Sequence, residues 1–287
     1  MISKTRKIKD LIVRSLIYIC AFFSVGLLIG IIAYVFIKGI SAVNWSFLTS
    51  VTSVLKGTVG IAGNIVNTII IIFLTMLIAT PIGIGSAIYL NEYAKPGRIV
   101  TTIEYATETL AGIPSIIFGL FGMMFFGEGL GLGYSLWTGA LTLILMVLPL
   151  ITRNTQEALK TVPDTYRNGA IGLGSGKWHM IRTILIPSAM PGIITGSILA
   201  IGRIVGESAA LLFTAGSAKL LPKGIEGLLN KPMQSGGTLT IQMYLSATSE
   251  GDFSTAFGIA VVLIIIVLCI NLITKAMTKR FDVSRKD

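Results

Sequence analysis

Residues 198–213 read ILAIGRIVGESAALLF, an apolar stretch that is interrupted by Arg203 and, four positions later, by Glu207. A charged side chain at the centre of a lipid bilayer costs about 2.5–3.5 kcal/mol even on permissive insertion scales. If the stretch forms one helix, this spacing places both side chains on the same face, where they can form an ion pair. Two interpretations remain open: the pair fixes helix packing, or it lines a transport pathway.

The composition of the chain is that of a membrane protein. Hydrophobic residues make up 53% of the 287 residues, only 13% are charged, and the mean hydropathy is +0.83. In a soluble domain about a quarter of the residues are charged. The net charge of +10 does not indicate nucleic-acid binding, because the basic residues flank the apolar stretches, where they orient helices and contact anionic lipid. We therefore predict membrane lipids, and no nucleic acid, among the partners.

Six apolar stretches are long enough to cross a bilayer as helices. They comprise residues 16–37, 64–90, 109–126, 136–152, 187–214 and 253–274. Of the 23 lysines and arginines, 17 lie in the termini and in the loops after the second and fourth stretches, and 5 lie in the other loops. The positive-inside rule then places both termini in the cytoplasm, and an even number of spans agrees with this. The predicted fold is an all-α integral membrane protein with a cytoplasmic segment 1–15, a transmembrane domain 16–274 and a cytoplasmic tail 275–287.

The loop over residues 153–186 is longer than a connection between two spans requires. It reads RNTQEALKTVPDTYRNGAIGLGSGKWHMIRTILI. We expect Pro163 to end the preceding helix, Asp164 to cap a short second helix, and GSG at 174–176 to break it. We expect a third helix over KWHMIRTIL, and we expect it to end at Pro187. Two short helices at an angle predict a compact projection into the cytoplasm. One face of the second helix is expected to carry Tyr166, Ala170 and Leu173.

The segment GLGSGKW partly matches the phosphate-binding loop of ATPases. That motif requires a glycine five positions before the glycine that precedes the lysine, and serine or threonine after the lysine. Ile171 and Trp178 occupy these positions here, and no strand pattern precedes the segment. We therefore expect a chain that hydrolyses no ATP, binds no cofactor of its own and has no catalytic residues. The single histidine, His179, has no companions at ligand spacing, so no metal site is predicted.

The same loop resembles the coupling loop of ABC importer permeases, whose pattern is E-A-A, three residues, G, nine residues, I-x-L-P. The residues that keep the spacing of this pattern are Ala170, Gly174, Ile184 and Pro187, with Ile186 where leucine is usual. Asn168 and Gly169 stand where the pattern has glutamate and alanine, which puts in doubt the ion pair that the glutamate would form with an ATPase.

Longer segments between residues 89 and 216 resemble the PstA-type permeases of the phosphate-specific ABC importer. These segments are YLNEYAKPGR, ETLAGIPSIIFGLFG, EALKTVPDTYRNGAIGLG, GKWHMIRTILIPSAMPGIITG and GRIVGESAALLFTAG. The resemblance implies a type I importer bundle of six transmembrane helices in the inner membrane of a bacterium. It also implies import of inorganic phosphate by alternating access.

The resemblance further implies three kinds of protein partner. They are a PstC-like permease, a dimer of a PstB-like ATPase that binds ATP and magnesium, and a PstS-like phosphate-binding protein. ATP binding is expected to close the ATPase dimer and to pull on the cytoplasmic projection. The coupling-loop residues predicted to transmit this movement are Tyr166, Asn168, Gly169, Ala170, Leu173 and Gly174.

The resemblance also places Arg203 and Glu207 on the translocation path. An arginine stays protonated and presents a planar fork that matches phosphate oxygens. Our hypothesis is that Arg203 contacts phosphate transiently and that Glu207 competes for its guanidinium group, so that the anion is released. Three alternatives remain: an importer of another oxyanion (molybdate, sulfate or a phosphonate), an ion-coupled secondary carrier, and a membrane scaffold that transports nothing.

Glycines recur near the start of the third predicted span, at Gly112, Gly119 and Gly122, and Pro114 lies among them. Small residues allow helices to approach closely in a membrane, so we expect close packing against a partner here. A hinge that takes part in gating is the alternative interpretation.

Overall fold

The computed structural model describes residues 4–53, 58–95, 97–222 and 224–281, and for residues 4–8, 53 and 277–281 it describes the backbone alone. Several basic residues counted for the predicted topology therefore lie outside the described residues: Lys56, Lys223, Arg285 and Lys286.

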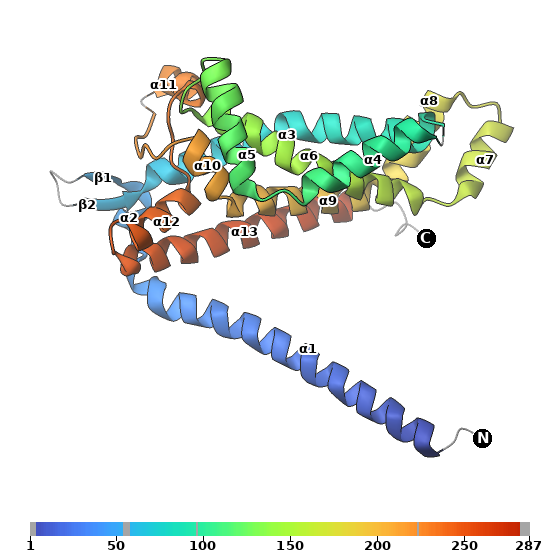
Figure 1. Ribbon diagram of the computed structural model, residues 1–287, viewed down its shortest axis with the longest axis horizontal. Coiled ribbons are helices and arrows are strands. Elements are labelled where there is room, and N and C mark those ends of the chain that lie inside the picture. The colour runs from blue at the N-terminus through green and yellow to red at the C-terminus, as the bar shows by residue number, and fades with distance from the viewer. Residues whose placement is uncertain (1–3, 54–57, 96, 223, 282–287) are drawn as a thin grey trace.

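Four long helices form the main bundle (Figure 1). They are α3 (Ala62–Ile88), α6 (Leu136–Lys160), α9 (Ile186–Gly206) and α13 (Phe253–Phe281). Helix α6 lies at the centre, because 67% of its apolar window is buried, against 28–33% for the other three. Its side chains pack on α3, α9 and the shorter α10 (Ala209–Thr214) in a core that includes Ile71, Leu143, Ile151, Ala200 and Leu211.

Glycines bring these helices close together, as association within a lipid bilayer requires. A Cβ atom added at Gly83 of α3 would lie 2.7 Å from the Ile151 side chain of α6. One added at Gly196 of α9 would lie 2.6 Å from the Asn154 side chain, also on α6. An apolar side chain that moves from lipid to a helix interface gains no hydrophobic free energy, because both surroundings are apolar. The stability of the bundle therefore depends largely on this close packing.

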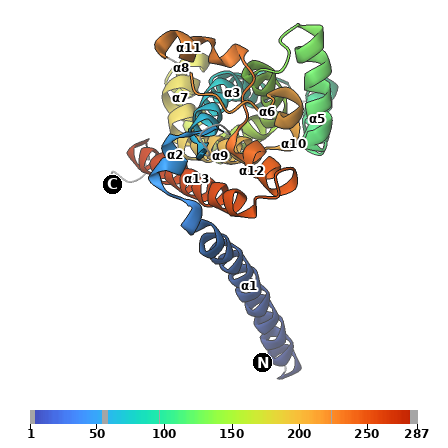
Figure 2. The ribbon, with the colours of Figure 1, turned by 90° about the vertical axis from the view of Figure 1, so that its left-hand side faces the viewer.

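Helix α1 (Lys4–Gly39) stands apart from the bundle and projects away from it (Figure 2). The apolar window between Lys9 and Ala42 has a mean hydropathy of 2.6, and none of it is buried. The helix meets α13 only near its end, where the rings of Tyr34 and Phe257 pack edge to face at 5.7 Å. An unpacked helix with so long an apolar stretch is stable only in lipid or against another protein.

The third predicted span is not one straight helix. Helix α4 (Arg98–Ala111) and the pair α5 (Ser115–Gly122) and η3 (Met123–Gly129, π-helical) meet at an angle of 99°. Gly112 ends α4, and Pro114 precedes α5 in an extended conformation. Proline disfavours helical geometry in the residue before it and donates no amide hydrogen, which explains the break. The prediction of a continuous helix over 109–126 is therefore wrong, and the two residues considered as a hinge lie at the bend.

The fifth predicted span also differs from the expectation at both ends. The helix that begins with α8 (Lys177–Met180) continues through the π-helical η4 (Ile181–Leu185) into α9, so Pro187 does not end it. Pro187 lies in the first turn of α9, and the wider π-helical turn before it relieves the clash that proline causes in a regular helix. The helix ends at Gly206, and α10 begins only at Ala209.

The loops after the first and fifth spans gather at one end of the long axis of Figure 1, on the left. The elements there are η1 (Ile40–Ala42), α2 (Trp45–Thr49), α11 (Gly224–Asn230), η5 (Lys231–Met233), α12 (Leu239–Thr248) and the antiparallel strands β1 (Val51–Ser53) and β2 (Thr58–Ile61). Two asparagines of α3 hold the loop before α12, since Asn64 Nδ2 donates to the Gly237 carbonyl oxygen (2.9 Å) and Asn67 Nδ2 to that of Ala218 (3.1 Å).

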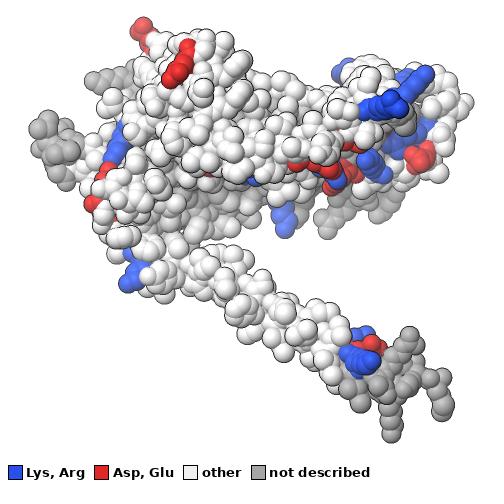
Figure 3. Space-filling view, viewed as in Figure 1, with Lys and Arg blue, Asp and Glu red and all other residues white. Residues whose placement is uncertain are grey.

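The opposite end carries η2 (Tyr89–Tyr93), α7 (Asp164–Gly172) and α8, together with the first turns of α1 and the last of α13. Lys and Arg side chains gather over α7 and α8 and at the start of α1, whereas the face seen in Figure 3 carries few charges between the two ends. Five continuous helices in the described ranges are long and apolar enough to cross a membrane, and the bent pair α4–α5 makes a sixth. The structure thus has five or six candidate spans, in agreement with an all-α membrane protein, while the side of the membrane that each end faces stays a prediction.

Gly119 of α5 provides a direct test of the packing. A Cβ atom there would lie 2.8 Å from Ala210 Cα, and backbone cannot move aside as a flexible side chain can. We expect Gly119→Ala to lower the free energy of unfolding in detergent by about 1–3 kcal/mol. Gly85→Ala is the matched control, because a Cβ atom at Gly85 has no neighbour within 4 Å. Equal unfolding temperatures of the two variants would contradict the close packing of α5 on α10.

Candidate functional site

Arg203 and Glu207 do not lie on one helix face. Helix α9 ends at Gly206, and the backbone of Glu207 is extended (φ −81°, ψ 123°). The Glu207 carboxylate turns to α10, where its Oε1 accepts a hydrogen bond from the Ala210 amide at 3.0 Å. The backbone carbonyl oxygen of Glu207 accepts a second hydrogen bond, from Thr240 Oγ1 at 2.8 Å. The predicted pairing of Arg203 with Glu207 is therefore wrong, because the helix that was to align them stops between them.

Arg203 instead points into a cavity of about 340 Å³. The cavity is lined by Thr107, Glu108 and Ala111 of α4, by Met146, Pro149, Leu150 and Arg153 of α6, and by Arg203 of α9. Within the described part of the chain, Arg203 forms no ion pair or side-chain hydrogen bond. A guanidinium group thus faces a partly polar hollow without a partner of its own.

Arg153, in the same cavity, is paired with two carboxylates. Its Nη1 atom binds Glu108 of α4, and its Nε atom binds Glu157, one turn further along α6, at 3.1 Å. The three side chains are between 54% and 61% exposed. Glu108 and Arg153 are 45 positions apart, so spacing along the chain could not reveal this pair.

The exposure of Arg153 and Arg203 determines what can cover this face of the bundle. Arg203 lies within a predicted span, where a guanidinium group that faces lipid is strongly unfavourable, and Arg153 lies near the end of α6 in the same cavity. The surface formed by α4, α6 and α9 must therefore face water or another protein. An aqueous path at an interface with a second membrane subunit meets this requirement.

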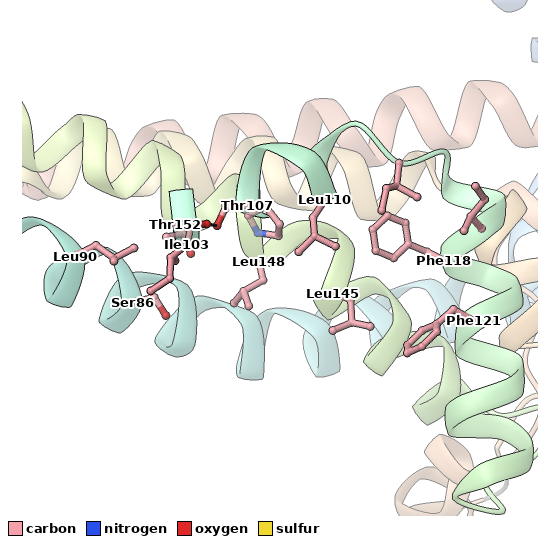
Figure 4. Close-up of a pocket in the computed structure, with 13 residues that line it drawn as sticks. Ser86, Leu90, Ile103, Thr107, Leu110, Phe118, Phe121, Leu145, Leu148 and Thr152 are labelled. Atoms are coloured by element: carbon pink, nitrogen blue, oxygen red, sulfur yellow. Dashed lines mark hydrogen bonds between the residues drawn. The ribbon is translucent and has the colours of Figure 1, made fainter. Parts of the chain in front are cut away.

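A second cavity, of about 470 Å³, lies on the other side of α4 (Figure 4). Its walls come from α3, α4, α5 and α6 and are almost entirely apolar, with Leu110, Phe118, Phe121, Leu145 and Leu148 among the labelled side chains. Thr107 lines both cavities. None of the described residues of α4 is buried, so this helix is held loosely between an apolar and a polar hollow.

The projection at residues 164–180 forms as a unit, but its packing face differs from the expected one. Of the α7 side chains, Ala170 is buried and Arg167 half-buried, whereas Tyr166 and Leu173 are 51% and 91% exposed. The face expected to carry Tyr166, Ala170 and Leu173 is therefore not a continuous packing face, because only Ala170 is buried. Asp164 does not cap α7 either, since its carboxylate binds Arg167 at 3.1 Å.

Glycine ends α7 as the sequence predicts. Gly174 has a positive φ of 79°, which side chains rarely adopt. The Ser175 amide donates to the Ala170 carbonyl oxygen and the Gly174 amide to that of Ile171, so the last carbonyl groups of the helix are satisfied. This sharp end directs the chain back towards the membrane and into α8.

Arg167 holds the projection in place, a role that the sequence did not reveal. Its Nη2 atom donates to Glu92 at the end of α3 (3.0 Å) and to the Leu159 carbonyl oxygen (2.9 Å), and its Nη1 atom donates to the Val162 carbonyl oxygen (2.8 Å). The side chains of Arg167 and Glu92 are only 17% and 6% exposed. Lys177 adds a second connection, because its Nζ lies 4.9 Å from the ring centre of Tyr93.

The outer surface of the projection carries an apolar patch among its polar and basic side chains. Ile171, Leu173, Trp178 and Tyr166 are all more than half exposed, and a Cβ atom at Gly169 would meet nothing within 4 Å. Asn168 and Gly169 lie on this exposed side, whereas Ala170 is buried against the bundle and is not available to a partner. An exposed apolar patch at the end of a membrane domain is typical of a surface that another protein covers.

One further buried charge lies in the loop at the opposite end. Lys231 is only 2% exposed, and its Nζ has one long hydrogen bond, to the Ser235 carbonyl oxygen at 3.5 Å. Burial lowers the pKa of this lysine. The polar, glycine-rich sequence around Lys231 gives no signal of this burial. No group of three or more potential metal ligands occurs among the described residues.

Comparison with known proteins relates this architecture to transporters. Residues 79–286 match the model of the family described as "Binding-protein-dependent transport system inner membrane component". The chain is 40% identical over 211 residues to the probable ABC transporter permease protein YqgI of Bacillus subtilis, covering 74% of this chain and 72% of that protein. It is 31% identical over 271 residues to the phosphate transport system permease protein PstA of Haemophilus influenzae, covering 94% of each.

Solved structures share the fold at low identity. A bacterial alginate ABC transporter in complex with an alginate-bound periplasmic protein matches with a TM-score of 0.70 at 13% identity, covering 96% of each chain. An inward-facing MetNI methionine ABC transporter matches with a TM-score of 0.60 at 18% identity, covering 75% of this chain and 93% of the other. With the family model and the relatives, these similarities show that the chain belongs to the family of binding-protein-dependent transport system inner membrane components.

Proposed function

We propose that this chain is one of two permease subunits of an ATP-driven importer that carries inorganic phosphate across the inner membrane of a bacterium. The observation that carries the proposal is the similarity to a phosphate transport permease over 94% of both chains. The cavity that contains Arg153 and Arg203 supports it, because guanidinium groups bind tetrahedral oxyanions through paired N–H donors.

The partners follow from the two surfaces that the chain leaves uncovered. A PstC-like permease covers the face of α4, α6 and α9 and completes the path, since the charges there cannot face lipid. A PstB-like ATPase dimer, which holds ATP and magnesium, docks on the apolar patch of Tyr166, Ile171, Leu173 and Trp178. A PstS-like binding protein delivers phosphate at the opposite end. This chain supplies no ATPase motif, and both its termini are cytoplasmic.

Transport then proceeds by alternating access. Closure of the ATPase dimer moves α7, and Arg167 transmits the movement to α3 through Glu92 and to α6 through Leu159 and Val162. Helix α4 responds, because it is loosely packed and connected to α5 by the bend at residues 112–114. The apolar cavity beside α4 gives it room to move, and its movement exposes the Arg203 cavity to one side of the membrane at a time.

Uptake by the complete complex in proteoliposomes tests this proposal. The chain is reconstituted with its partner permease, ATPase and binding protein, and uptake of radiolabelled phosphate is measured with and without ATP. We expect uptake to require ATP, to continue after an ionophore collapses the ion gradients, and to resist competition by sulfate or molybdate. Loss of uptake with the gradient, while ATP stays high, would support a secondary carrier. Competition by molybdate or sulfate would instead support an importer of that anion.

A further inference from the structure

Two arginines in the cavity of α4, α6 and α9 offer N–H groups that nothing in the described chain occupies. The guanidinium group of Arg203 has no partner there, and the Nη2 atom of Arg153 has none either. Both side chains line the same hollow of about 340 Å³, which is large enough for an anion and several waters. Two guanidinium groups at one cavity match an anion with several oxygens, since each can bind two of them.

The two carboxylates bound to Arg153 hold it in different ways. Glu157 lies on the same helix, four residues further on, and binds the Nε atom next to the aliphatic stem. Glu108 comes from α4 and binds the outer Nη1 atom. Glu157 can therefore keep the stem of Arg153 in position while the outer edge of the guanidinium group changes partner.

A third, smaller cavity continues the path towards α7. It measures about 210 Å³ and shares Glu108 and Arg153 with the Arg203 cavity. Its other walls come from Glu104, Gln156, Glu157 and Lys160, so carboxylates outnumber the basic groups. The ion pair of Glu108 and Arg153 thus stands between a cavity that attracts anions and one that repels them.

Resting on the proposed function, we infer that Arg153 and Arg203 together form the oxyanion site of this subunit and that Glu108 is the carboxylate that the anion displaces. An oxyanion bound to Arg203 also reaches the Nη1 edge of Arg153 and replaces Glu108 there. Two negative groups cannot bind that edge together at low cost. Loss of this pair frees α4 from α6. When Glu108 returns to Arg153, it displaces the anion from the two guanidinium groups.

This assignment replaces Glu207 by Glu108 as the competitor. Glu207 is only 9% exposed and already accepts a hydrogen bond from the first turn of α10. Glu108 is on the wall of the Arg203 cavity and bound to an exposed arginine, where exchange costs little.

A double-mutant cycle tests the inference through binding and not through transport. Radiolabelled inorganic phosphate is titrated onto the assembled complex in nanodiscs, without the binding protein, for Glu108→Gln, Arg153→Gln and the double variant. We expect Glu108→Gln to raise the affinity about two- to fivefold, as loss of one half-exposed competing ion pair allows. Arg153→Gln lowers the affinity, and in that background Glu108→Gln has no further effect. Glu128→Gln, which removes an exposed carboxylate on η3, leaves the affinity unchanged.

The possible outcomes separate this inference from the proposed substrate. Unchanged or weaker binding by Glu108→Gln, or an equal gain with and without Arg153, overturns the inference while phosphate uptake stands. A wild-type complex that binds sulfate or molybdate in place of phosphate, and shows the same cycle with that anion, overturns the phosphate assignment and supports the two-arginine site. Absence of binding of any of these anions by both wild type and Glu108→Gln overturns the inference. Unfolding temperatures of all variants confirm that each is folded.

Discussion

Replacing Arg203 with glutamine should lower phosphate uptake by the reconstituted complex about 10- to 100-fold. A hydrogen bond to a charged group contributes about 1.5–3 kcal/mol, which corresponds to this range. Glutamine keeps a polar side chain, although a shorter one, and removes the charge, so the cavity loses one of its two positive groups. Uptake of radiolabelled phosphate at matched protein amounts measures the effect, and co-purification of the ATPase verifies assembly.

Arg203→Lys is the informative companion variant. Lysine keeps the positive charge but replaces the planar fork by a single ammonium group. If phosphate binds the fork through two oxygens, Arg203→Lys should recover only part of the uptake. Full uptake by Arg203→Gln in a normally assembled complex would show that Arg203 belongs to a structural surface, and the alternative interpretation of packing would prevail.

The sequence predicts the spans well because their signal is local. A stretch of about 20 apolar residues can satisfy its backbone in lipid only as a helix, whatever its neighbours are. The second and fourth spans, for example, are found as α3 and α6, although α6 continues to Lys160. The ends and breaks depend on more than apolarity. Pro114 is a cause of the break that is visible in the sequence. The sequence nevertheless favoured close packing there, with a hinge as the alternative.

The candidate site depends on contacts that spacing along the chain cannot show. The backbone carbonyl oxygen of Glu207 accepts a hydrogen bond from Thr240, which lies 33 positions away. This bond forms just after the end of α9, where the sequence predicted a continuous helix. Glu108 reaches Arg153 across 45 positions. Arg203 could be singled out because a charge in an apolar stretch is rare, whereas Glu108 and Arg153 lie at span ends, where charges are ordinary.

Replacing Glu92 with glutamine should uncouple ATP hydrolysis from transport, lowering phosphate moved per ATP at least about tenfold. Removal of one partner from a mostly buried ion pair costs about 3 kcal/mol or more, because the other charge loses its buried counter-charge. Here the remaining charge is Arg167, which fastens α7 to the ends of both α3 and α6. With Glu92 neutralised, α7 can still dock on the ATPase, but its movement no longer reaches α3. Parallel assays of ATPase activity and phosphate uptake on one preparation give the ratio.

Asp164→Asn is the matched control, since Asp164 binds the same guanidinium group as Glu92. Its side chain is 88% exposed, against 6% for Glu92, and exposed pairs contribute little. We expect Asp164→Asn to change the ratio of phosphate to ATP by less than about twofold. If the two variants uncouple equally, exposure does not decide the strength of these contacts and the connection from α7 to α3 is not the route of the movement. If neither variant uncouples ATP hydrolysis from transport, and both still bind the ATPase, the movement of α7 reaches the bundle through α6 alone. Arg167 still contacts that end of α6 through the carbonyl oxygens of Leu159 and Val162.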